Sequence, residues 1–414
     1  MLWSLINQMD NFIKSVLEEK HGYLSKMLDL ERERQEKNIE LIASENYASD
    51  AVRAAMASCL TNKYAEGLPG RRYYGGCQYI DIIENCCKET WKKVFNTNYA
   101  VNVQPHSGSQ ANEAAYAALL NPGDTILSLD LKHGGHLSHG SPVNFSGKLY
   151  DIKSYNVDKN EFIDYYEIAN AISLYHPHLV IAGASAYPRA IDFKEIKFWI
   201  DEVSRVDYIP HPVYFMVDMA HIAGLVATGD HPSPFGYADI VTTTTHKTLR
   251  GPRGGLIFCK PELEAKVNGA VFPGTQGGPL EHIILAKAVC AEECLTDEYK
   301  EYISQVVKNA RAMAEEFKML GYKLVTNGTD THMLLIDLSE THPNISGLQV
   351  QEECDKYGIT LNRNSVPKDK RSPYHASGLR IGTPAMTTRG WKEQDFVLCA
   401  EQIDKIIKNL TSDK

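Results

Sequence analysis

Apolar residues fall in short, nearly continuous runs between about residue 90 and residue 259, and helical patterns separate these runs. The strand-like runs cover residues 99–103, 125–129, 179–182, 214–217, 241–245 and 256–259. Strands that are apolar on both faces belong to sheets covered on both sides, and such sheets are built from parallel βα units. The pattern predicts an α/β fold with a mostly parallel sheet that has room for one antiparallel strand.

Helical patterns flank this core. Apolar side chains at residues 2, 5, 6, 9, 12, 13, 16 and 17 predict an amphipathic N-terminal helix, and residues 23–39 form a second, charge-rich helical stretch. Thr296 is a candidate N-cap, and the strands and helices after it form a smaller α/β unit. The sequence predicts a helical arm over residues 1–50, a large domain over 51–295 and a small C-terminal domain over 296–414.

Composition narrows the class of protein. A hydrophobic fraction of 43% and a charged fraction of 23% are typical of a soluble globular chain, and the net charge of −9 argues against a nucleic-acid binder. The nine cysteines show no CxxC pair, which predicts free thiols in a reducing compartment. Charged residues interrupt the N-terminal apolar positions, so we expect neither a signal peptide nor a membrane span, and a cytoplasmic location.

The most informative segment is VTTTTHKTLRGPRGG, residues 241–255. His246 and Lys247 follow a β-branched run directly and precede a glycine-rich loop. A lysine just beyond a buried strand end is poorly solvated, and desolvation leaves more of its amine neutral, as a Schiff-base nucleophile requires. The alternative is a solvated surface lysine after a strand.

Asp218 ends the apolar run that begins at Val213, and His221 follows one turn later. A carboxylate at the end of a buried strand lies where open α/β sheets bind ligands, and it calls for a cationic partner. A protonated ring nitrogen would be such a partner. The alternative is a helix N-cap.

Ser107, Gly108 and Ser109 lie between a strand-like run and a helical run that we assign to residues 113–120. Hydroxyls and free backbone N–H groups at such a turn can hold a phosphate, although the same residues often only cap a helix.

Three histidines, His133, His136 and His139, recur at three-residue intervals among glycines. The spacing is compatible with a metal site, but we expect no acidic or cysteine ligand nearby, and the flanking glycines disfavour a rigid helical face of ligands. We expect no metal, and instead one imidazole stacked on a flat cofactor; purely structural histidines are the alternative.

Two tyrosine-rich turns, residues 62–67 and 71–76, combine phenols and arginines with Glu66, a candidate proton shuttle. Exposed tyrosines are the alternative. Arg380 stands alone in an apolar run, where it either binds a substrate carboxylate or forms an internal salt bridge.

Together these groups are what pyridoxal phosphate needs: a lysine, an acid for its ring nitrogen, a phosphate turn and a stacking imidazole. No GxGxxG opens a βαβ unit and no GxxxxGK[ST] is present, which argues against nicotinamide and P-loop sites.

The chain resembles serine hydroxymethyltransferase, a family of pyridoxal-phosphate enzymes of one-carbon metabolism and amino-acid biosynthesis. The matching segments run in family order over nearly the whole chain: LIASEN, NKYAEG, RYYGG, PHSGSQAN, HGGHLSHGSPVNFSG, VDMAHIAGL, TTTTHKTLRGPRGG, GTQGGP and RIGTP.

The resemblance implies a fold-type-I transferase with a mixed, mostly parallel seven-stranded sheet, and a homodimer, possibly a tetramer, with shared active sites. It implies that Lys247 carries pyridoxal phosphate covalently, with Thr244 nearby. The other cofactor residues would be Ser107, Gly108, Ser109, His136, Ser185, Asp218, His221 and His246, with Tyr64, Gly277 and Gly278 from the second subunit.

The resemblance also implies the residues that bind the substrates. The amino acid would contact Ser44, Glu66, Tyr74 and Arg380, and Glu66 would move protons between substrate and folate. Tetrahydrofolate would contact Glu66, Tyr73, Leu131, Gly135, His136, Leu137, Asn364, Ser372, Pro373 and Tyr374.

The implied activity is reversible transfer of the hydroxymethyl carbon of L-serine to tetrahydrofolate, giving glycine and 5,10-methylenetetrahydrofolate through an external aldimine. One alternative is a folate-independent aldolase of β-hydroxy amino acids, of the threonine or α-methylserine type. Another is a catalytically silent protein of this fold, which the lysine, aspartate and arginine argue against.

Overall fold

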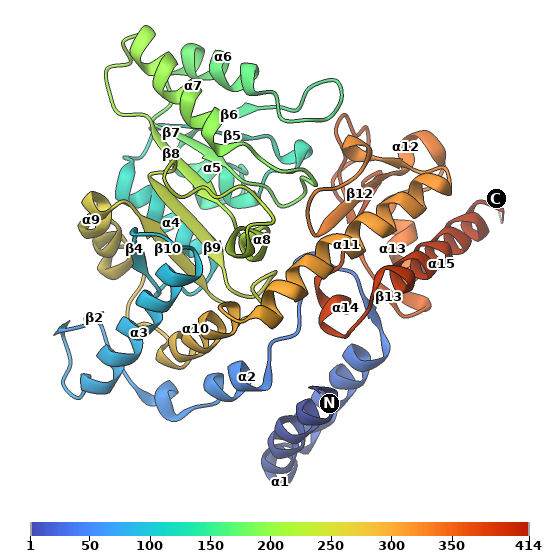
Figure 1. The fold of residues 1–414 in the computed structure, drawn as a ribbon, viewed down its shortest axis with the longest axis horizontal. Helices are drawn as coiled ribbons and strands as arrows, with labels where there is room; N and C mark the ends of the chain where they lie inside the picture. Colours follow the sequence, from blue (N-terminus) through green and yellow to red (C-terminus); the bar gives the residue numbers. More distant parts are fainter. Residues whose placement is uncertain (1, 413–414) are drawn as a thin grey trace.

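The computed structural model describes residues 2–412, and the side chains of residues 10–411. Its larger sheet has seven strands in the order β4-β10-β9-β8-β7-β5-β6 (Figure 1). β10 is antiparallel to both neighbours and the other pairs are parallel, so the predicted mixed, mostly parallel sheet is confirmed. The strands are β4 (Ala100–Asn102), β5 (Thr125–Leu129), β6 (Asp151–Tyr155), β7 (Leu179–Ala182), β8 (Tyr214–Asp218), β9 (Ile240–Thr244) and β10 (Gly255–Cys259).

Both faces of this sheet are covered, which explains why its strands are apolar throughout. Successive residues of β8, Phe215 and Met216, belong to different hydrophobic cores, because side chains alternate across a strand. α4 (Gly108–Leu119) and α9 (Glu264–Gly269) supply one core. The opposite core is supplied by α3 (Gln78–Val94), α6 (Tyr165–Tyr175), α7 (Phe193–Val206), α8 (Ala223–Thr228) and α10 (Glu281–Cys294).

The smaller sheet is antiparallel, in the order β11-β12-β15-β14. It contains β11 (Lys323–Leu324), β12 (Met333–Asp337), β14 (Asn362–Asn364) and β15 (Gly378–Gly382). Its core includes Phe317, Leu334 and Phe396, contributed in part by α11 (Asp297–Met319) and α15 (Glu393–Ser412). The remaining elements of this region are α12 (Leu338–Thr341), α13 (Gly347–Lys356), β13 (Ile359–Thr360) and α14 (Pro384–Thr388).

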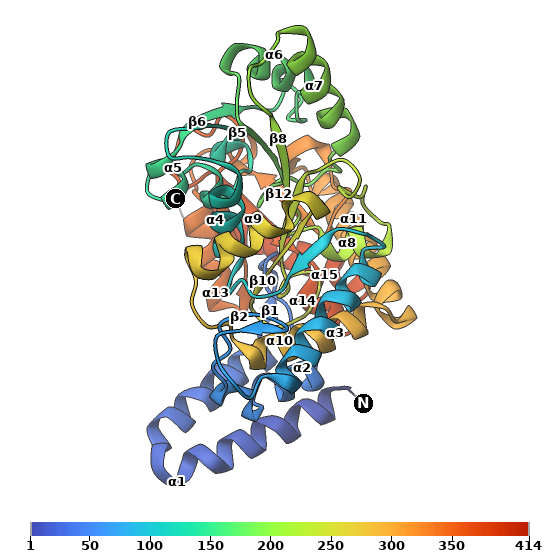
Figure 2. The same cartoon turned by 90° about the vertical axis from the view of Figure 1, so that its left-hand side faces the viewer.

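The N-terminal arm is α1 (Leu2–Lys37), interrupted at His21 by non-helical backbone angles. The two halves turn back on each other (Figure 2), and Lys14 Nζ lies 2.8 Å from Asp29 Oδ2 across the turn. The helical stretch expected to reach residue 39 stops earlier, because β1 (Ile39–Glu40) pairs with β13. The chain then continues through α2 (Asp50–Met56), β2 (Gly67–Leu68) and β3 (Arg71–Arg72).

α11 crosses from one sheet region to the other (Figure 1). Tyr299 and Val306 near its start pack in the core of the larger sheet, while Met313 and Phe317 near its end pack in the core of the smaller one. The helix therefore belongs to both regions, and the division of the chain at residue 295 stays a prediction.

Two further local expectations changed. The helix after the phosphate turn begins at Gly108 rather than at residue 113, because Ser107 caps it. β6 was not expected, since its sequence DIKSY has no apolar run.

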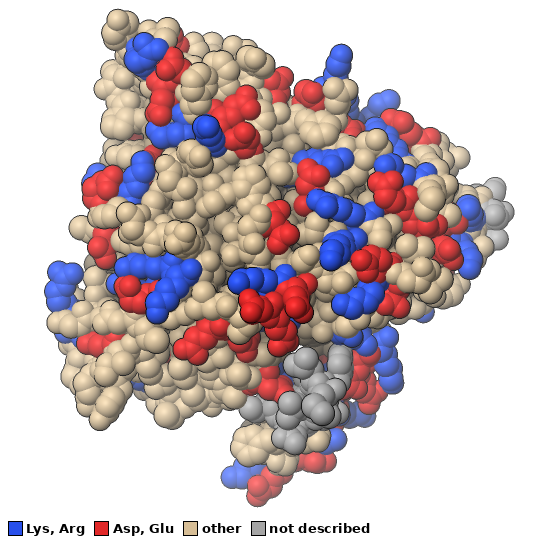
Figure 3. All heavy atoms as spheres, in the orientation of Figure 1, with Lys and Arg blue, Asp and Glu red and all other residues tan. Residues whose placement is uncertain are grey.

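Within residues 2–412, no helix combines the length and apolarity that a membrane span needs. On the face shown in Figure 3, lysines and arginines are interspersed with acidic residues.

Candidate active site

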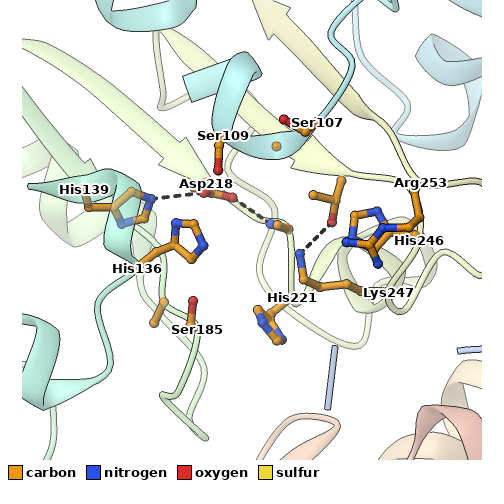
Figure 4. A pocket seen from close by; sticks show the side chains of 14 residues that line it. Ser107, Ser109, His136, His139, Ser185, Asp218, His221, His246, Lys247 and Arg253 are labelled. Atoms are coloured by element: carbon orange, nitrogen blue, oxygen red, sulfur yellow. Dashed lines mark hydrogen bonds and ion pairs between the residues drawn. The ribbon is translucent and has the colours of Figure 1, made fainter. Parts of the chain in front are cut away.

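The carboxyl ends of the parallel strands meet at one edge of the larger sheet, where open α/β sheets bind ligands. A cavity of about 170 Å³ lies there (Figure 4). Ten of the candidate residues line it: Ser107, Gly108, Ser109, His136, Ser185, Asp218, His221, Thr244, His246 and Lys247.

Lys247 projects into this cavity from the loop after β9. Its Nζ atom donates a hydrogen bond of 2.9 Å to the Oγ1 atom of Thr244, and Asn46 Nδ2 holds its backbone carbonyl at 2.9 Å. Burial lowers the pKa of Lys247 to about 8, although the charge of Asp218 opposes this shift. The amine is therefore neutral in a sizeable fraction of molecules near pH 8, unlike that of a solvated surface lysine.

Asp218 carries the carboxylate at the end of β8. Its Oδ2 atom accepts hydrogen bonds from Asn112 Nδ2 at 2.9 Å and His139 Nε2 at 3.0 Å, and its Oδ1 atom accepts one from Ala220 N at 3.0 Å. Burial by itself would raise the pKa of Asp218, but the hydrogen bond and charge of His139 hold it well below its usual range. Asp218 does not cap α8, whose N-cap is Ile222.

The phosphate turn lies at the N-terminus of α4. Ser107 accepts a hydrogen bond from Gln110 N at 3.2 Å, so it caps the helix while also lining the cavity. A Cβ atom at Gly108 would lie only 2.6 Å from Thr244 Cγ2. Glycine thus lets the positive end of α4 approach the end of β9, next to Lys247.

The histidines separate into different environments. His136 lines the cavity, its Nδ1 atom lies 2.6 Å from Ser138 Oγ, and burial lowers its pKa to about 4. Ligand atoms of His136, His139 and Asp218 lie within 4.8 Å of one another. The expectation that no acidic group is near these histidines was therefore wrong, because the fold brings Asp218 to them from a different strand; His133 is not in this group.

His246 and His221 complete the lysine side of the cavity. Burial lowers the pKa of His246 to about 3, and that of His221 also lies well below its usual range because of burial. Both imidazoles are therefore neutral at physiological pH. His221 Nδ1 lies 3.2 Å from Nε2 of His332, which belongs to the smaller-sheet region.

Arg380 lies on β15, outside the cavity lining. Its Nη1 atom donates to the backbone carbonyl of Ser185 at 2.8 Å and its Nε atom to Asn362 Oδ1 at 3.2 Å. Burial lowers the pKa of Arg380 to about 10. Arg380 forms no ion pair within 4.0 Å with any of the described side chains, residues 10–411, so the internal salt bridge considered from the sequence is wrong. Ser44 lines an adjacent cavity of about 300 Å³ that shares His246 with the first.

The tyrosine-rich turns form a second cluster, separate from the cavity. Tyr64 donates to Glu66 Oε1 at 3.1 Å, and its ring centroid lies 5.0 Å from that of Tyr74. Gly278 lies against Tyr64, since a Cβ atom there would be 3.4 Å from Tyr64 Cζ, and a Cβ atom at Gly277 would be 3.4 Å from Glu66 Oε1. Tyr73 is 76% exposed in the single chain.

Apart from Glu66 and Tyr73, the expected folate residues lie on two segments, residues 131–137 and residues 364–374. Leu131, Gly135 and Leu137 belong to the loop after β5. In this loop, the Gly134 carbonyl accepts hydrogen bonds from Ser185 N at 2.8 Å and from Ala186 N at 3.1 Å. Asn364 ends β14, two residues before Val366, which packs on Ala186. The two segments thus approach Ala186 from different sheets. Ser372, Pro373 and Tyr374 are exposed, and the Arg363 guanidinium lies 4.9 Å from the centre of the Tyr374 ring.

Sequence reasoning missed four residues of the lining: His139, Ala184, Ala220 and Arg253. The three-residue spacing marked His139, but only as one of three histidines considered for a metal and not as a residue of the cofactor cavity. Nothing in the sequence distinguishes Arg253 from its neighbours. Arg253 lines both cavities. A family model described as serine hydroxymethyltransferase matches residues 17–403.

Proposed function

Because the chain belongs to the serine hydroxymethyltransferase family of pyridoxal-phosphate-dependent transferases, we propose that it moves the hydroxymethyl carbon of L-serine to tetrahydrofolate. The products would be glycine and 5,10-methylenetetrahydrofolate. The observation that carries the proposal is that Lys247, Asp218 and the Ser107–Ser109 turn face one cavity of about 170 Å³.

The residues around this cavity fit pyridoxal phosphate. The close approach at Gly108 leaves backbone N–H groups at a helix end for the phosphate, and the ionised Asp218 calls for a cation such as a protonated ring nitrogen. When bound there, the cofactor supplies an aldehyde carbon and an electron-accepting ring. Lys247 would hold the aldehyde carbon, Ser107 and Ser109 the phosphate, and His136 the ring face.

Lys247 combines two properties that its role requires. Its lowered pKa leaves neutral amine for attack on a carbonyl, and Thr244 Oγ1 at 2.9 Å fixes the direction of its Nζ atom. Once displaced from the cofactor, the same amine can hold or move a proton at Nζ. Neutral His246 and His221 beside it add no competing positive charge.

Arg380 is the residue that would bind the carboxylate of the amino acid. It keeps its charge at physiological pH, and two of its nitrogens are fixed by Ser185 and Asn362. Its Nη2 atom donates no hydrogen bond to any group of the described residues 10–411, which leaves this donor for a carboxylate oxygen. Ser44 and Tyr74 would assist it.

The cluster of exposed Tyr64, Tyr73 and Tyr74 with half-buried Glu66 supports a homodimer, because an exposed aromatic patch marks an interaction surface. In the proposed dimer this cluster, with Gly277 and Gly278, would complete the cavity of the second subunit. Glu66, whose Oε1 atom accepts a hydrogen bond from the Tyr64 hydroxyl, would then transfer a proton from its other carboxyl oxygen. Tetrahydrofolate would lie along residues 131–137 and the 364–374 segment, and the enzyme would act in the cytoplasm.

The test uses the purified holoenzyme with serine, with and without tetrahydrofolate. Formation of glycine that requires tetrahydrofolate, together with borohydride trapping of the cofactor on the peptide containing Lys247, is the expected result. Serine cleavage that tetrahydrofolate does not accelerate would identify a folate-independent aldolase. The absence of label at Lys247 would overturn the assignment of the site.

A further inference from the structure

The segment between β7 and α7, residues 183–191, connects three parts of the molecule. Its start lines the cavity through Ala184 and Ser185. Its middle packs on the smaller-sheet region, since Ala186 shares a small core with Val325, Leu335 and Val366. The position of Ser185 therefore depends on how firmly this segment is held against the smaller sheet.

Arg189 makes the strongest of these attachments. Its Nη1 atom lies 2.9 Å from Asp330 Oδ1, its Nε atom donates to Thr326 Oγ1 at 3.0 Å, and its Nη2 atom donates to the Thr326 carbonyl at 2.7 Å. All three guanidinium nitrogens are thus used on one loop. Lysine, with a single ammonium group, cannot reproduce this arrangement.

Backbone hydrogen bonds reinforce the attachment. Asp330 N donates to the Pro188 carbonyl at 2.8 Å, Thr329 Oγ1 donates to the same carbonyl at 3.1 Å, and Ala190 N donates to Asp330 Oδ2 at 3.3 Å. We call the contacts of residues 188–190 with residues 326–330 the clasp.

The residues of the clasp that precede β12 adopt an energetically unfavourable backbone conformation. Thr326 has φ 58° and Asn327 has φ 55°, which are left-handed values that non-glycine residues avoid. Such a loop persists only where its surroundings fix it. Two residues provide that restraint. Arg189 holds the loop from one side, and on the other side Glu161 Oε2 accepts a hydrogen bond of 2.9 Å from Thr326 N.

The clasp and Arg380 are connected through the smaller sheet. β12 starts three residues after Asp330 and pairs with β15, where Leu335 lies opposite Arg380. Arg380 in turn donates to the carbonyl of Ser185, four residues before Arg189. These contacts form a closed loop of connections. It runs from Ser185 along the chain to Arg189, across the clasp to β12, through β15 to Arg380, and back to Ser185.

We propose that Arg189 is a positioning residue that fixes the separation between Arg380 and the Ser185 wall of the cavity, and so selects the small side chain of serine over bulkier β-hydroxy amino acids. The inference rests on the proposed function, in which Arg380 binds the carboxylate. If the clasp is loosened, Arg380 loses its fixed distance from the cavity. Carboxylate binding then weakens, while an added methyl group on the substrate meets less resistance.

The test compares Arg189→Ala, Arg189→Lys and Asp330→Asn holoenzymes with the wild type, using serine and allo-threonine as substrates and glycine affinity as a measurement independent of turnover. We expect the KM for serine and the Kd for glycine to rise about 10-fold in the alanine variant, with kcat within about 2-fold. In the same variant, the ratio of kcat/KM for serine to kcat/KM for allo-threonine should fall several-fold. Added guanidinium ion should partly restore serine affinity to Arg189→Ala.

The matched control is Lys323→Met. Lys323 forms ion pairs of 2.8–3.1 Å with Glu161, Asp337 and Glu340 at the same junction but does not contact residues 183–191. An unchanged KM in this control supports positioning by Arg189; an equal rise would indicate a general loosening of the junction and overturn the inference.

The remaining outcomes are equally decisive. An unchanged KM and unchanged selectivity in Arg189→Ala, or in Asp330→Asn if the alanine variant does not fold, would overturn the inference while the wild type stays active. A wild type that does not cleave serine would instead overturn the proposed function.

Discussion

The Nε2 atom of His139 lies 3.0 Å from the Oδ2 atom of Asp218, and these two residues come from segments almost eighty positions apart in the chain. His139 belongs to a short helix after β5, whereas Asp218 ends β8. The imidazole thus keeps ionised the carboxylate that we assign to the cofactor ring.

Replacing His139 by alanine should raise the pKa of Asp218 towards neutrality, because the hydrogen bond and charge that lower it are lost while burial remains. The affinity for pyridoxal phosphate should then fall, and fall most at acid pH, where the variant carboxylate is protonated. Titration of cofactor affinity from about pH 5 to about pH 8 measures this. His139→Gln keeps a hydrogen-bond donor, so its cofactor affinity at acid pH should lie between those of the wild type and His139→Ala. Identical pH profiles of cofactor affinity in all three proteins would contradict the role of His139.

Lys247→Ala should reduce turnover by about 10³-fold, in the range of a lost acid–base group, since the variant has neither the nucleophile nor the proton carrier. In the cofactor-free wild type, the rate of covalent attachment should rise with pH until about pH 8 and then level off, because only the neutral amine reacts. Stopped-flow absorbance measures this rate. Lys260→Ala is the control, because Lys260 pairs with Asp239 away from the cavity; full folate-dependent activity in Lys247→Ala would contradict the assignment.

Gly108→Ala should destabilise the protein by about 1–3 kcal/mol, because the new Cβ atom would lie 2.6 Å from Thr244 Cγ2. Thr244→Ser removes that methyl group and keeps the hydroxyl that holds Lys247, so the double variant should recover most of the loss. Urea unfolding gives the free energies. Gly269→Ala, which meets no atom within 4 Å, is the control and should be neutral or slightly stabilising. Additive losses in the double variant would show that the two side chains do not collide.

Mixing two inactive variants tests the shared site. Lys247→Ala lacks the cavity lysine, and Glu66→Gln removes the carboxylate of the tyrosine-rich cluster. In mixed dimers one of the two sites has both residues intact. If subunits pair at random, about a quarter of wild-type activity should return after co-refolding. Recovery of no activity, with mixed dimers verified by mass spectrometry, would mean that both residues serve a cavity within one chain.

The sequence predicts the part of the fold that depends on periodicity. The runs at residues 125–129 and 179–182 are strands with those bounds, because residues buried on both faces leave an uninterrupted apolar signal. β6 has no such signal, since it lies at the sheet edge with partly exposed side chains. The strand-end residues Asp218 and Lys247 could be located because parallel strands place their ends together.

Other features depend on contacts that sequence spacing does not encode. The hydrogen bond of His139 to Asp218 and the contact of Arg189 with Asp330 join residues 79 and 141 positions apart. The hydrogen bond from Arg380 to the Ser185 carbonyl likewise joins residues that are far apart in the sequence. The contacts of Arg189 and Arg380 follow from how the two sheets pack, and that of His139 follows from the strand order within the larger sheet. A single sequence carries no record of either arrangement.

α11 has a consequence for the integrity of the whole molecule. One continuous helix of 23 residues contributes to the hydrophobic interiors of both sheets, so neither interior survives once that helix unravels. Heating should therefore give a single calorimetric transition, and proteolytic nicking within the helix should release no durable fragment. The region that contains the cavity and the region that contains Arg380 should therefore unfold together.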